Sequence, residues 1–339
     1  MFEKNKTYLI TGAVGFIGYF LARRLLEQGC RVIGLDNLND YYDVNLKHAR
    51  LEKLRTFEQF IFIKGDISDK EVVFGAFETY KPHIVVNLAA QAGVRYSIEN
   101  PDVYIQSNLI GFYNILEACR HHPVDHLVYA SSSSVYGANE KVPFTETDFV
   151  DHPVSLYAAT KKSNELMAYT YSHLYKIPAT GLRFFTVYGP MGRPDMAYFG
   201  FTQKYFAGEP IRIFNNGDVE NDLYRDFTYI DDIVEGLVRL LEVPPRADGG
   251  VPHTVFNIGN NRPEKLMNFI ETLEKALSRS LGREVLFKKI FEPIKPGDVP
   301  ATFASTDRLE KAVGFKPSTS IEEGLQKFTN WYCEYYQVK

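Results

Sequence analysis

Residues 7–18 read TYLITGAVGFIG, an apolar run that passes directly into three glycines spaced three residues apart. Residues 7–10 predict a short buried strand, and the apolar residues of 20–26 recur at the spacing of one helix face. A second apolar run at 31–35 predicts another strand, which ends at Asp36. The stretch therefore predicts a strand, a tight turn, a helix and a second strand in direct succession.

The alternation of apolar runs and helical segments continues along the chain. Further strands are predicted at 61–63, 84–88 and 127–130, and the residues that follow them are small or polar. Strands that are apolar on both faces and separated by helices predict a parallel, doubly wound sheet of the Rossmann type, which is an α/β fold. Ligands of such sheets bind at the carboxyl ends of the strands, where these small and polar residues are expected.

The bulk composition argues against several classes of protein. The chain has 339 residues and a formal net charge of −4, so nothing favours a nucleic-acid or membrane surface as a partner. No apolar run approaches the roughly 20 residues of a membrane span, and little chain precedes the first predicted strand to serve as a signal peptide. The three cysteines are far apart and form no metal or disulfide pattern. We therefore expect a cytoplasmic protein with no metal site.

The glycine-rich turn predicts a site for a dinucleotide. Glycines at G-x-x-G-x-x-G spacing let the backbone approach a pyrophosphate and place its charge at a helix N-terminus. Asp36 would accept hydrogen bonds from the adenosine ribose hydroxyls, and its charge would repel a 2′-phosphate, which favours NAD over NADP. Asp66, at a later strand end, is placed either to reach the adenine or to cap a helix. The alternative is a turn that binds no nucleotide.

A tyrosine and a lysine downstream of this turn indicate chemistry on a hydroxyl group. Tyr157 and Lys161 are four residues apart and share one face of a predicted helix. The lysine and a nicotinamide cation would lower the pKa of the phenol, so that it could take a hydroxyl proton while hydride leaves the same carbon. Residues 131–134 are four serines after a predicted strand, and a serine there could relay that proton. The alternative for Tyr157 and Lys161 is an exposed pair on the helix surface. The alternative for the serines is a polar turn with no catalytic role.

Together these motifs resemble the extended short-chain dehydrogenase/reductase family, and within it the NAD-dependent nucleotide-sugar epimerases. The resemblance covers most of the chain, and it is carried by 11–18, 36–37, 87–90, 133–137, Tyr157 with Lys161, and 225–232. More narrowly, the chain is similar to UDP-glucuronate 4-epimerases in residues 41–47, 91–97, 183–190 and 192–197.

The resemblance implies a role for individual residues. It implies that the catalytic residues are Ser132, Tyr157 and Lys161. The implied contacts of NAD are Gly12, Gly15, Phe16, Ile17, Gly18, Asp36, Asn37, Asp66, Ile67, Leu88, Ala89, Ala90, Asn108, Ser131, Tyr157 and Lys161. The implied contacts of the sugar nucleotide are Gln91, Arg95, Ser132, Ser133, Ser134, Thr186, Arg193, Phe214, Arg225 and Asp298. Among the latter, Ser133, Ser134 and Thr186 would lie near the sugar carboxylate, and Arg193 and Arg225 near the diphosphate or the segments around it.

The implied reaction is 4-epimerisation of UDP-glucuronate to UDP-galacturonate through a transient 4-keto sugar, with tightly bound NAD regenerated in each turnover. Related dehydratases carry Asp-Glu, and decarboxylases a Glu, at the positions of Ser133 and Ser134, which favours simple oxidation and re-reduction at one carbon. The alternatives are a 4-epimerase of UDP-glucose or UDP-N-acetylglucosamine, a UDP-glucuronate decarboxylase, and a non-catalytic NAD-binding sensor.

The resemblance also implies an organisation and an assembly. Residues 1–185 are expected to form the NAD-binding Rossmann domain, with return segments near 226–262. The remaining segments of 186–339 are expected to form a smaller, interleaved substrate-binding domain. A homodimer through helices near 103–121 and 157–175 is implied, with candidate apolar contacts at Val103, Leu109, Phe112, Leu116, Leu166, Tyr169 and Tyr171.

Overall fold

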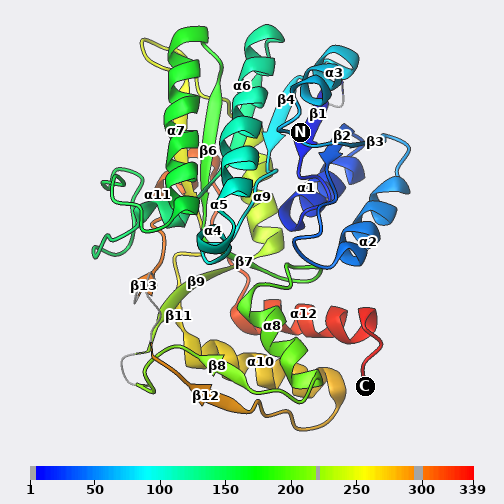
Figure 1. The fold of residues 1–339 in the computed structure, drawn as a ribbon, viewed down its shortest axis with the longest axis vertical. Helices are drawn as coiled ribbons and strands as arrows, with labels where there is room; N and C mark the ends of the chain where they lie inside the picture. The colour runs from blue at the N-terminus through cyan, green and yellow to red at the C-terminus, as the bar shows by residue number, and fades with distance from the viewer. Residues whose placement is uncertain (1–4, 219–221, 294–300) are drawn as a thin grey trace.

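The computed structural model describes residues 5–218, 222–293 and 301–339, and a seven-stranded parallel sheet organises its upper part (Figure 1). The strand order is β10-β6-β5-β4-β1-β2-β3, with every neighbouring pair parallel. The strands are β1 (Thr7–Thr11), β2 (Arg31–Asp36), β3 (Phe60–Lys64), β4 (Ile84–Asn87), β5 (His126–Ser132), β6 (Ala179–Phe184) and β10 (His253–Ile258). The prediction of a doubly wound α/β sheet is confirmed.

Helices cover both faces of this sheet. One face packs against α1 (Phe16–Glu27), α2 (Val44–Arg55) and α9 (Ile230–Leu241), and the other against α3 (Lys70–Tyr80), α6 (Gly111–His121) and α7 (Leu156–Tyr175). The alternation of side chains along β1 explains why both faces are apolar. Tyr8 and Ile10 join the core beneath the first set of helices, whereas Leu9 joins the core beneath the second.

The other segments form a smaller part below the sheet in Figure 1. Its strand β9 (Tyr224–Tyr229) pairs with β7 (Thr186–Tyr188), β11 (Pro263–Lys265) and β13 (Ala301–Thr302), while β8 (Ile211–Ile213) pairs with β12 (Lys289–Phe291). Its helices are α8 (Ala197–Phe206), α10 (Leu266–Leu281) and α12 (Ile321–Tyr335). The shorter helices are α4 (Tyr96–Glu99), α5 (Pro101–Tyr104), the π-helix η1 (Ile105–Ile110), the 3-10 helix η2 (Ser133–Tyr136) and α11 (Asp307–Val313).

The return segments expected near 226–262 divide between the two parts. β10 extends the main sheet beside β6, and α9 packs on α1, whereas β9 belongs to the smaller sheet. The chain therefore crosses between the parts more than once after residue 185. The assignment of 1–185 and 186–339 to two domains stays a prediction.

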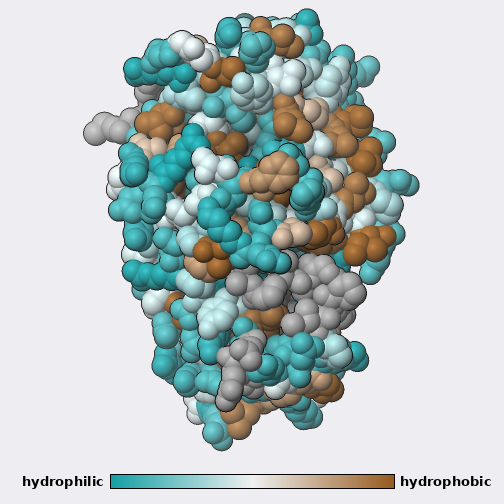
Figure 2. All heavy atoms as spheres, turned by 90° about the vertical axis from the view of Figure 1, so that its left-hand side faces the viewer, coloured by the Kyte–Doolittle hydropathy of each residue, from teal (hydrophilic) through white to brown (hydrophobic). Residues whose placement is uncertain are grey.

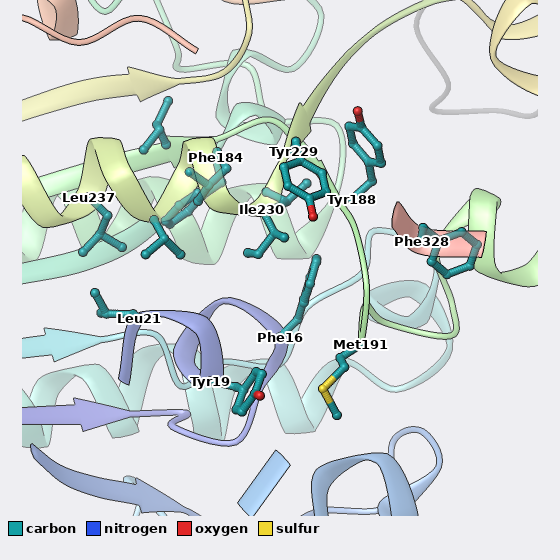
Figure 3. Packing of buried hydrophobic residues seen from close by; sticks show 14 of the residues in the cluster. Phe16, Tyr19, Leu21, Phe184, Tyr188, Met191, Tyr229, Ile230, Leu237 and Phe328 are labelled. Carbon is teal, nitrogen blue, oxygen red and sulfur yellow. The ribbon is translucent and has the colours of Figure 1, made fainter. Parts of the chain in front are cut away.

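One apolar core runs through both parts. Phe16 and Tyr19 of α1 lie across from Tyr229 and Ile230 at the start of α9 (Figure 3), and all four are buried in a single cluster. The same cluster includes Phe328 of α12 in the lower part. The smaller part is thus packed onto the sheet layer by shared apolar contacts.

The surface is mixed in character. The upper half of the face in Figure 2 shows apolar side chains interspersed with polar ones. None of the helices built from the described residues has the length and apolar character needed to traverse a bilayer.

Two of the residues expected to form a dimer contact are not available for one, so this part of the expectation is wrong. Phe112 and Leu116 are buried in the core between α6 and the sheet.

A buried carboxylate joins three segments of the chain beneath the main sheet. Asp226 of β9 is completely buried and accepts hydrogen bonds from the backbone N–H groups of Asn260 at 2.7 Å, Asn261 at 3.0 Å and Ala304 at 3.1 Å. These donors lie in segments far from β9 in sequence. A buried donor that loses its acceptor costs free energy, so this carboxylate fixes how the segments meet.

We predict that Asp226→Asn lowers the free energy of unfolding by about 2–3 kcal/mol, because the amide replaces one acceptor oxygen with a donor that faces backbone N–H groups. Urea unfolding followed by circular dichroism measures the change. Asp248→Asn, at an exposed loop position, is the matched control and should change stability by less than about 0.5 kcal/mol. Equal stability of the two variants would contradict the assigned role of Asp226.

Candidate active site

A cavity of about 260 Å³ lies at the carboxyl ends of the main-sheet strands. It brings together most of the predicted cofactor contacts, namely Gly12, Gly15, Phe16, Ile17, Gly18, Asp36, Asn37, Asp66, Ile67, Leu88, Ala89, Ala90, Ser131, Tyr157 and Lys161. Of the predicted contacts of the sugar nucleotide, Gln91, Ser132 and Arg193 line it. Residues more than 150 positions apart in sequence thus share one cavity.

The glycine-rich turn leaves no room for side chains. Gly12 has a φ of +68°, a left-handed conformation that favours glycine. A Cβ added at Gly18 would lie 2.1 Å from the carbonyl oxygen of Gly12. The turn closes through a hydrogen bond from Gly15 N to Gly12 O of 2.9 Å, and α1 starts directly after it. Its backbone is therefore exposed to the cavity at a helix N-terminus.

The carboxylate of Asp36 is buried at the end of β2 and supports this turn. It accepts hydrogen bonds from the backbone N–H of Val14 at 3.2 Å and of Leu38 at 2.9 Å. Burial raises its pKa, against these hydrogen bonds and the charge of Lys47. Lys47, which the sequence analysis did not single out, also lines the cavity, and its ammonium donates to Asn39 O at 2.6 Å.

Asp66 lines the cavity next to Asn37. Its carboxylate accepts hydrogen bonds from Asn37 Nδ2 at 2.7 Å and from the backbone N–H of Ser68 at 2.8 Å. The N-cap of α3 is Asp69, whose side chain accepts from Glu71 N and Val72 N, so the expectation that Asp66 caps this helix is wrong. Contact of Asp66 with an adenine stays a prediction.

The predicted catalytic residues come from β5 and α7. Ser132 ends β5, and Tyr157 and Lys161 lie in the first two turns of α7, where all three side chains line the cavity. Lys161 donates from Nζ to the carbonyl oxygen of Ala130 at 2.9 Å, and burial lowers its pKa to about 8. The ammonium is therefore held at the strand end beside Ser132.

Burial dominates the pKa of Tyr157 in the protein by itself. Burial raises it, and a hydrogen bond with Ser132 and the charge of Arg193 oppose that rise without overcoming it. Lys161 donates to the backbone of β5, and the expected lowering of the Tyr157 pKa by this lysine together with a nicotinamide cation stays a prediction. A further cation beside the phenol would be needed to favour the tyrosinate.

Several predicted contacts of the sugar nucleotide do not line the cavity, namely Arg95, Ser133, Ser134, Thr186, Phe214 and Arg225. The guanidinium of Arg95 lies over the ring of Phe214 at 5.2 Å. Ser134 accepts a hydrogen bond from Ser132 Oγ at 3.2 Å, directly behind the catalytic candidate. Asp298 lies outside the described residues. These six residues and Asp298 stay predictions.

Asn108 also does not line the cavity but supports a residue that does. In the π-helix η1 its side chain accepts from Gln91 N at 2.8 Å and donates to Gln91 O at 3.0 Å. It donates as well to Thr160 Oγ1 of α7 at 3.1 Å. Asn108 therefore fixes the backbone of Gln91 against α7, and direct contact with the cofactor stays a prediction.

An acidic partner of Arg193 was missed from the sequence. Arg193 Nε donates to Asp195 Oδ1 at 3.0 Å, with a second bond from Nη2 to Oδ2, and Tyr41 Oη donates to Asp195 Oδ2 at 3.1 Å. Burial raises the pKa of Asp195, but the arginine charge and hydrogen bonds lower it overall. The aspartate thus ties the segment after β2 to the segment that carries Arg193.

A second missed residue, Arg50 of α2, braces the same two sides of the cavity. It is completely buried and donates to Val14 O at 2.9 Å, to Met191 O at 2.6 Å and to Tyr42 Oη at 2.7 Å. Met191 has a φ of +52°, so Arg50 holds a left-handed turn just before Arg193. The glycine turn and the arginine-bearing segment are therefore joined through one guanidinium.

Metal ligands are not grouped in the part of the chain that the structure describes. No cluster of three or more His, Cys, Asp or Glu side chains there could hold a metal ion. The described carboxylates that line the cavity are Asp36 and Asp66, at the ends of β2 and β3. The strand order places β1 and β4 between them and the Ser132 end of β5.

Known proteins resemble the chain over almost its whole length. A family model described as GDP-mannose 4,6 dehydratase matches residues 9–328. A protein of Rhizobium meliloti (strain 1021) described as a probable UDP-glucuronate 4-epimerase is 48% identical over 343 residues, covering 97% of this chain and 98% of that one. UDP-glucuronate 4-epimerase 1 of Arabidopsis thaliana is 46% identical over 336 residues, covering 97% of this chain and 77% of that one.

A solved structure of a related protein has a similar fold. The UDP-glucuronic acid 4-epimerase of Bacillus cereus, in complex with UDP-glucuronic acid and NAD, matches with a TM-score of 0.86 at 32% identity. The match covers 97% of this chain and 100% of that chain.

We predict that Arg50→Lys lowers the free energy of unfolding by about 3 kcal/mol, because one ammonium cannot reach all the acceptors and buried carbonyls lose a charged donor. Tyr42→Phe, which removes one of those acceptors, is the control and should cost about 1 kcal/mol or less. Thermal and urea unfolding measure both. Similar losses in the two variants would contradict a bracing role for Arg50.

Proposed function

We propose that this chain, which belongs to the family described as GDP-mannose 4,6 dehydratase within the extended short-chain dehydrogenase/reductases, is an NAD-dependent UDP-glucuronate 4-epimerase. The enzyme is an isomerase that interconverts UDP-glucuronate and UDP-galacturonate through a 4-keto sugar. The observation that carries the proposal is the cavity in which Ser132, Tyr157 and Lys161 meet beside the glycine turn. The relatives that carry the epimerase name extend over 97% of the chain.

The residues at the glycine turn and at the end of β2 in this cavity fit NAD. The absence of side chains at Gly12 and Gly18 opens the backbone to a pyrophosphate at the start of α1. Asp36 offers a carboxylate at the end of β2, where a ribose binds in such sheets, and its charge disfavours a 2′-phosphate. When bound there, NAD supplies a hydride acceptor and donor for C4 of the sugar.

The chain's own residues manage the proton at the sugar 4-hydroxyl. The phenol of Tyr157 takes this proton as the carbon is oxidised and returns it when the carbon is reduced, with Ser132 holding the hydroxyl. Lys161 lies one turn along α7 and keeps positive charge near the phenol when it ionises. Inversion requires the keto sugar to turn between the two steps while the diphosphate stays held, which is the role proposed for Arg193 and Arg225.

The serine segment favours epimerisation over elimination or loss of CO2. A 4-keto uronic acid is a β-keto acid, which loses CO2 when the breaking bond aligns with the ketone. Ser133 and Ser134 of η2 hold no carboxyl group that could serve as an acid or base. We assign to them and to Thr186 the binding of the sugar carboxylate in an unaligned orientation. Neutral-sugar epimerisation is the second candidate, and it requires no such carboxylate contact.

We predict that the purified protein converts UDP-glucuronate to UDP-galacturonate without added NAD, as measured by proton NMR. Tyr157→Phe should lower the rate by about 10²–10⁴-fold, because the general acid–base group is removed. Tyr175→Phe, at the far end of α7, is the control and should retain the rate. Formation of a UDP-pentose would indicate a decarboxylase, and turnover only of UDP-glucose or UDP-N-acetylglucosamine would indicate a neutral-sugar epimerase.

A homodimer in the cytoplasm is part of the proposal. Exposed apolar side chains gather on α7 and on the helices before α6, and they include Val103, Ile105, Ile110, Leu166, Tyr169 and Leu174. Leu166 is 57% exposed and Leu174 is 58% exposed, about two turns apart on α7. A second copy of this face would bury these side chains.

We predict that Leu166→Glu converts a dimer to a monomer of 38.8 kDa, because the charge would be buried at the contact. Light scattering after size exclusion measures the mass. Leu286→Glu changes a 65% exposed leucine in the lower part and should leave the dimer intact. A wild-type protein that is monomeric at micromolar concentration would contradict the assembly.

A further inference from the structure

One face of α7 contacts three consecutive residues at the end of β5. Tyr157, Lys161 and Glu165 recur every four residues and therefore lie on one side of this helix. Lys161 Nζ donates to Ala130 O at 2.9 Å, and Glu165 Oε1 accepts from Ser131 Oγ at 2.7 Å. The third pair is Tyr157 and Ser132, which both line the cavity and whose interaction lowers the pKa of Tyr157.

Glu165 is held by a second buried charge. Arg183 of β6 donates to Glu165 Oε1 from Nε and to Oε2 from Nη2, both at 2.8 Å. The Arg183 side chain is 4% exposed and that of Glu165 is 5% exposed. The β5–β6 register places Arg183 directly beside Ser131. The carboxylate orientation is therefore fixed by a two-point contact from the neighbouring strand.

The same arginine reaches the far end of the serine segment. Arg183 Nη1 donates to Tyr136 Oη at 3.1 Å, and Tyr136 Oη donates to Asn257 Oδ1 of β10 at 2.6 Å. Asn257 in turn donates to Phe144 O at 2.9 Å. One buried ion pair thus holds both ends of residues 131–136, because Glu165 bonds Ser131 and Arg183 bonds Tyr136. Such a pair gains little stability over apolar packing, so its value here is to fix position.

We propose that Glu165, oriented by Arg183, is a positioning residue of the reaction, which fixes Ser131 so that the adjacent Ser132 meets the phenol of Tyr157. The proposal rests on the proposed function, because it concerns how the same site holds its proton-transferring groups. Glu165 itself does not line the cavity, so it acts through the strand end. This role is separate from those proposed for Ser132, Tyr157 and Lys161.

Loss of this positioning would change the pH dependence of the reaction, which can be measured. The groups that face Tyr157 are Ser132 from β5, the ring of Tyr104 from α5 at 6.0 Å, Arg193 and Asp195 from the segment before α8, and Lys161 from α7 itself. The interaction with Ser132 lowers the pKa of Tyr157. If the strand end relaxes, this contribution is lost and the pKa rises. The tyrosinate is the active base, so the ascending limb of the pH profile moves to higher pH.

The test uses Ser131→Ala, which removes the hydrogen bond to Glu165 and leaves the ion pair intact. Glu165→Gln would instead leave Arg183 buried without its charge partner, and it could fail to fold. We expect Ser131→Ala to lower kcat about tenfold and to raise the pKa of the ascending limb of kcat by about half to one unit. The NAD content of each purified protein is measured alongside.

The matched control is Ser172→Ala on the same helix. The Ser172 hydroxyl is buried and has no hydrogen-bond partner among the described residues, so the same atom is removed without loss of a contact. We expect its pH profile to equal that of the wild type. A lower melting temperature of Ser131→Ala with an unchanged profile would show a merely structural role and overturn the proposal.

A second measurement separates this inference from the proposed function. Carbon NMR of protein labelled at tyrosine Cζ, assigned with Tyr157→Phe, gives the pKa of Tyr157 without any turnover. A higher pKa in Ser131→Ala than in the wild type supports the positioning role even if UDP-glucuronate is not converted. Equal pKa values overturn it, whereas absence of conversion by the wild type overturns the proposed function alone.

Discussion

The close contact between the start of α1 and the end of β1 is the constraint on which the site depends. With no Cβ at Gly18, the helix begins against the carbonyl of Gly12 and presents its N-terminus to the cavity. Both backbone groups of Val14 in this turn are held by buried side chains, its N–H by Asp36 and its carbonyl by Arg50. The position of the turn therefore sets the position of β2, α2 and the segment before Arg193.

The sequence was sufficient for features that depend on local order along the chain. Apolar runs separated by helical segments predicted the sheet, and the strand ends predicted where Asp36, Asp66 and Ser131 would meet. Arg50 could not be found in this way, because its acceptors at Met191 and Gly192 lie more than 140 residues away. Its helix α2 also has no pronounced apolar face to mark which side is buried.

The differences between the expected and the observed contacts of the candidate site have a common physical origin. Asn108 and Ser134 were assigned to ligands by resemblance, yet each hydrogen-bonds a neighbour that lines the cavity. The spacing of Tyr157 and Lys161 also did not predict that burial of the phenol raises its pKa in the protein by itself, or that Lys161 donates to Ala130 O. Spacing along a helix predicts which side chains share a face, whereas polar partners depend on the fold around that face.

The continuous apolar core also limits how the site exchanges its ligands. Separation of the upper and lower parts as rigid bodies would expose apolar side chains that meet between them, such as Phe16 and Tyr229, to water. Each large apolar side chain so exposed costs about 1.5–3 kcal/mol, so wide hinge opening would be rare. Small molecules must then enter and leave through rearrangement of surface segments such as that tied by Asp195 and Tyr41. A cofactor that sits deeper than these segments would stay in place while sugars come and go.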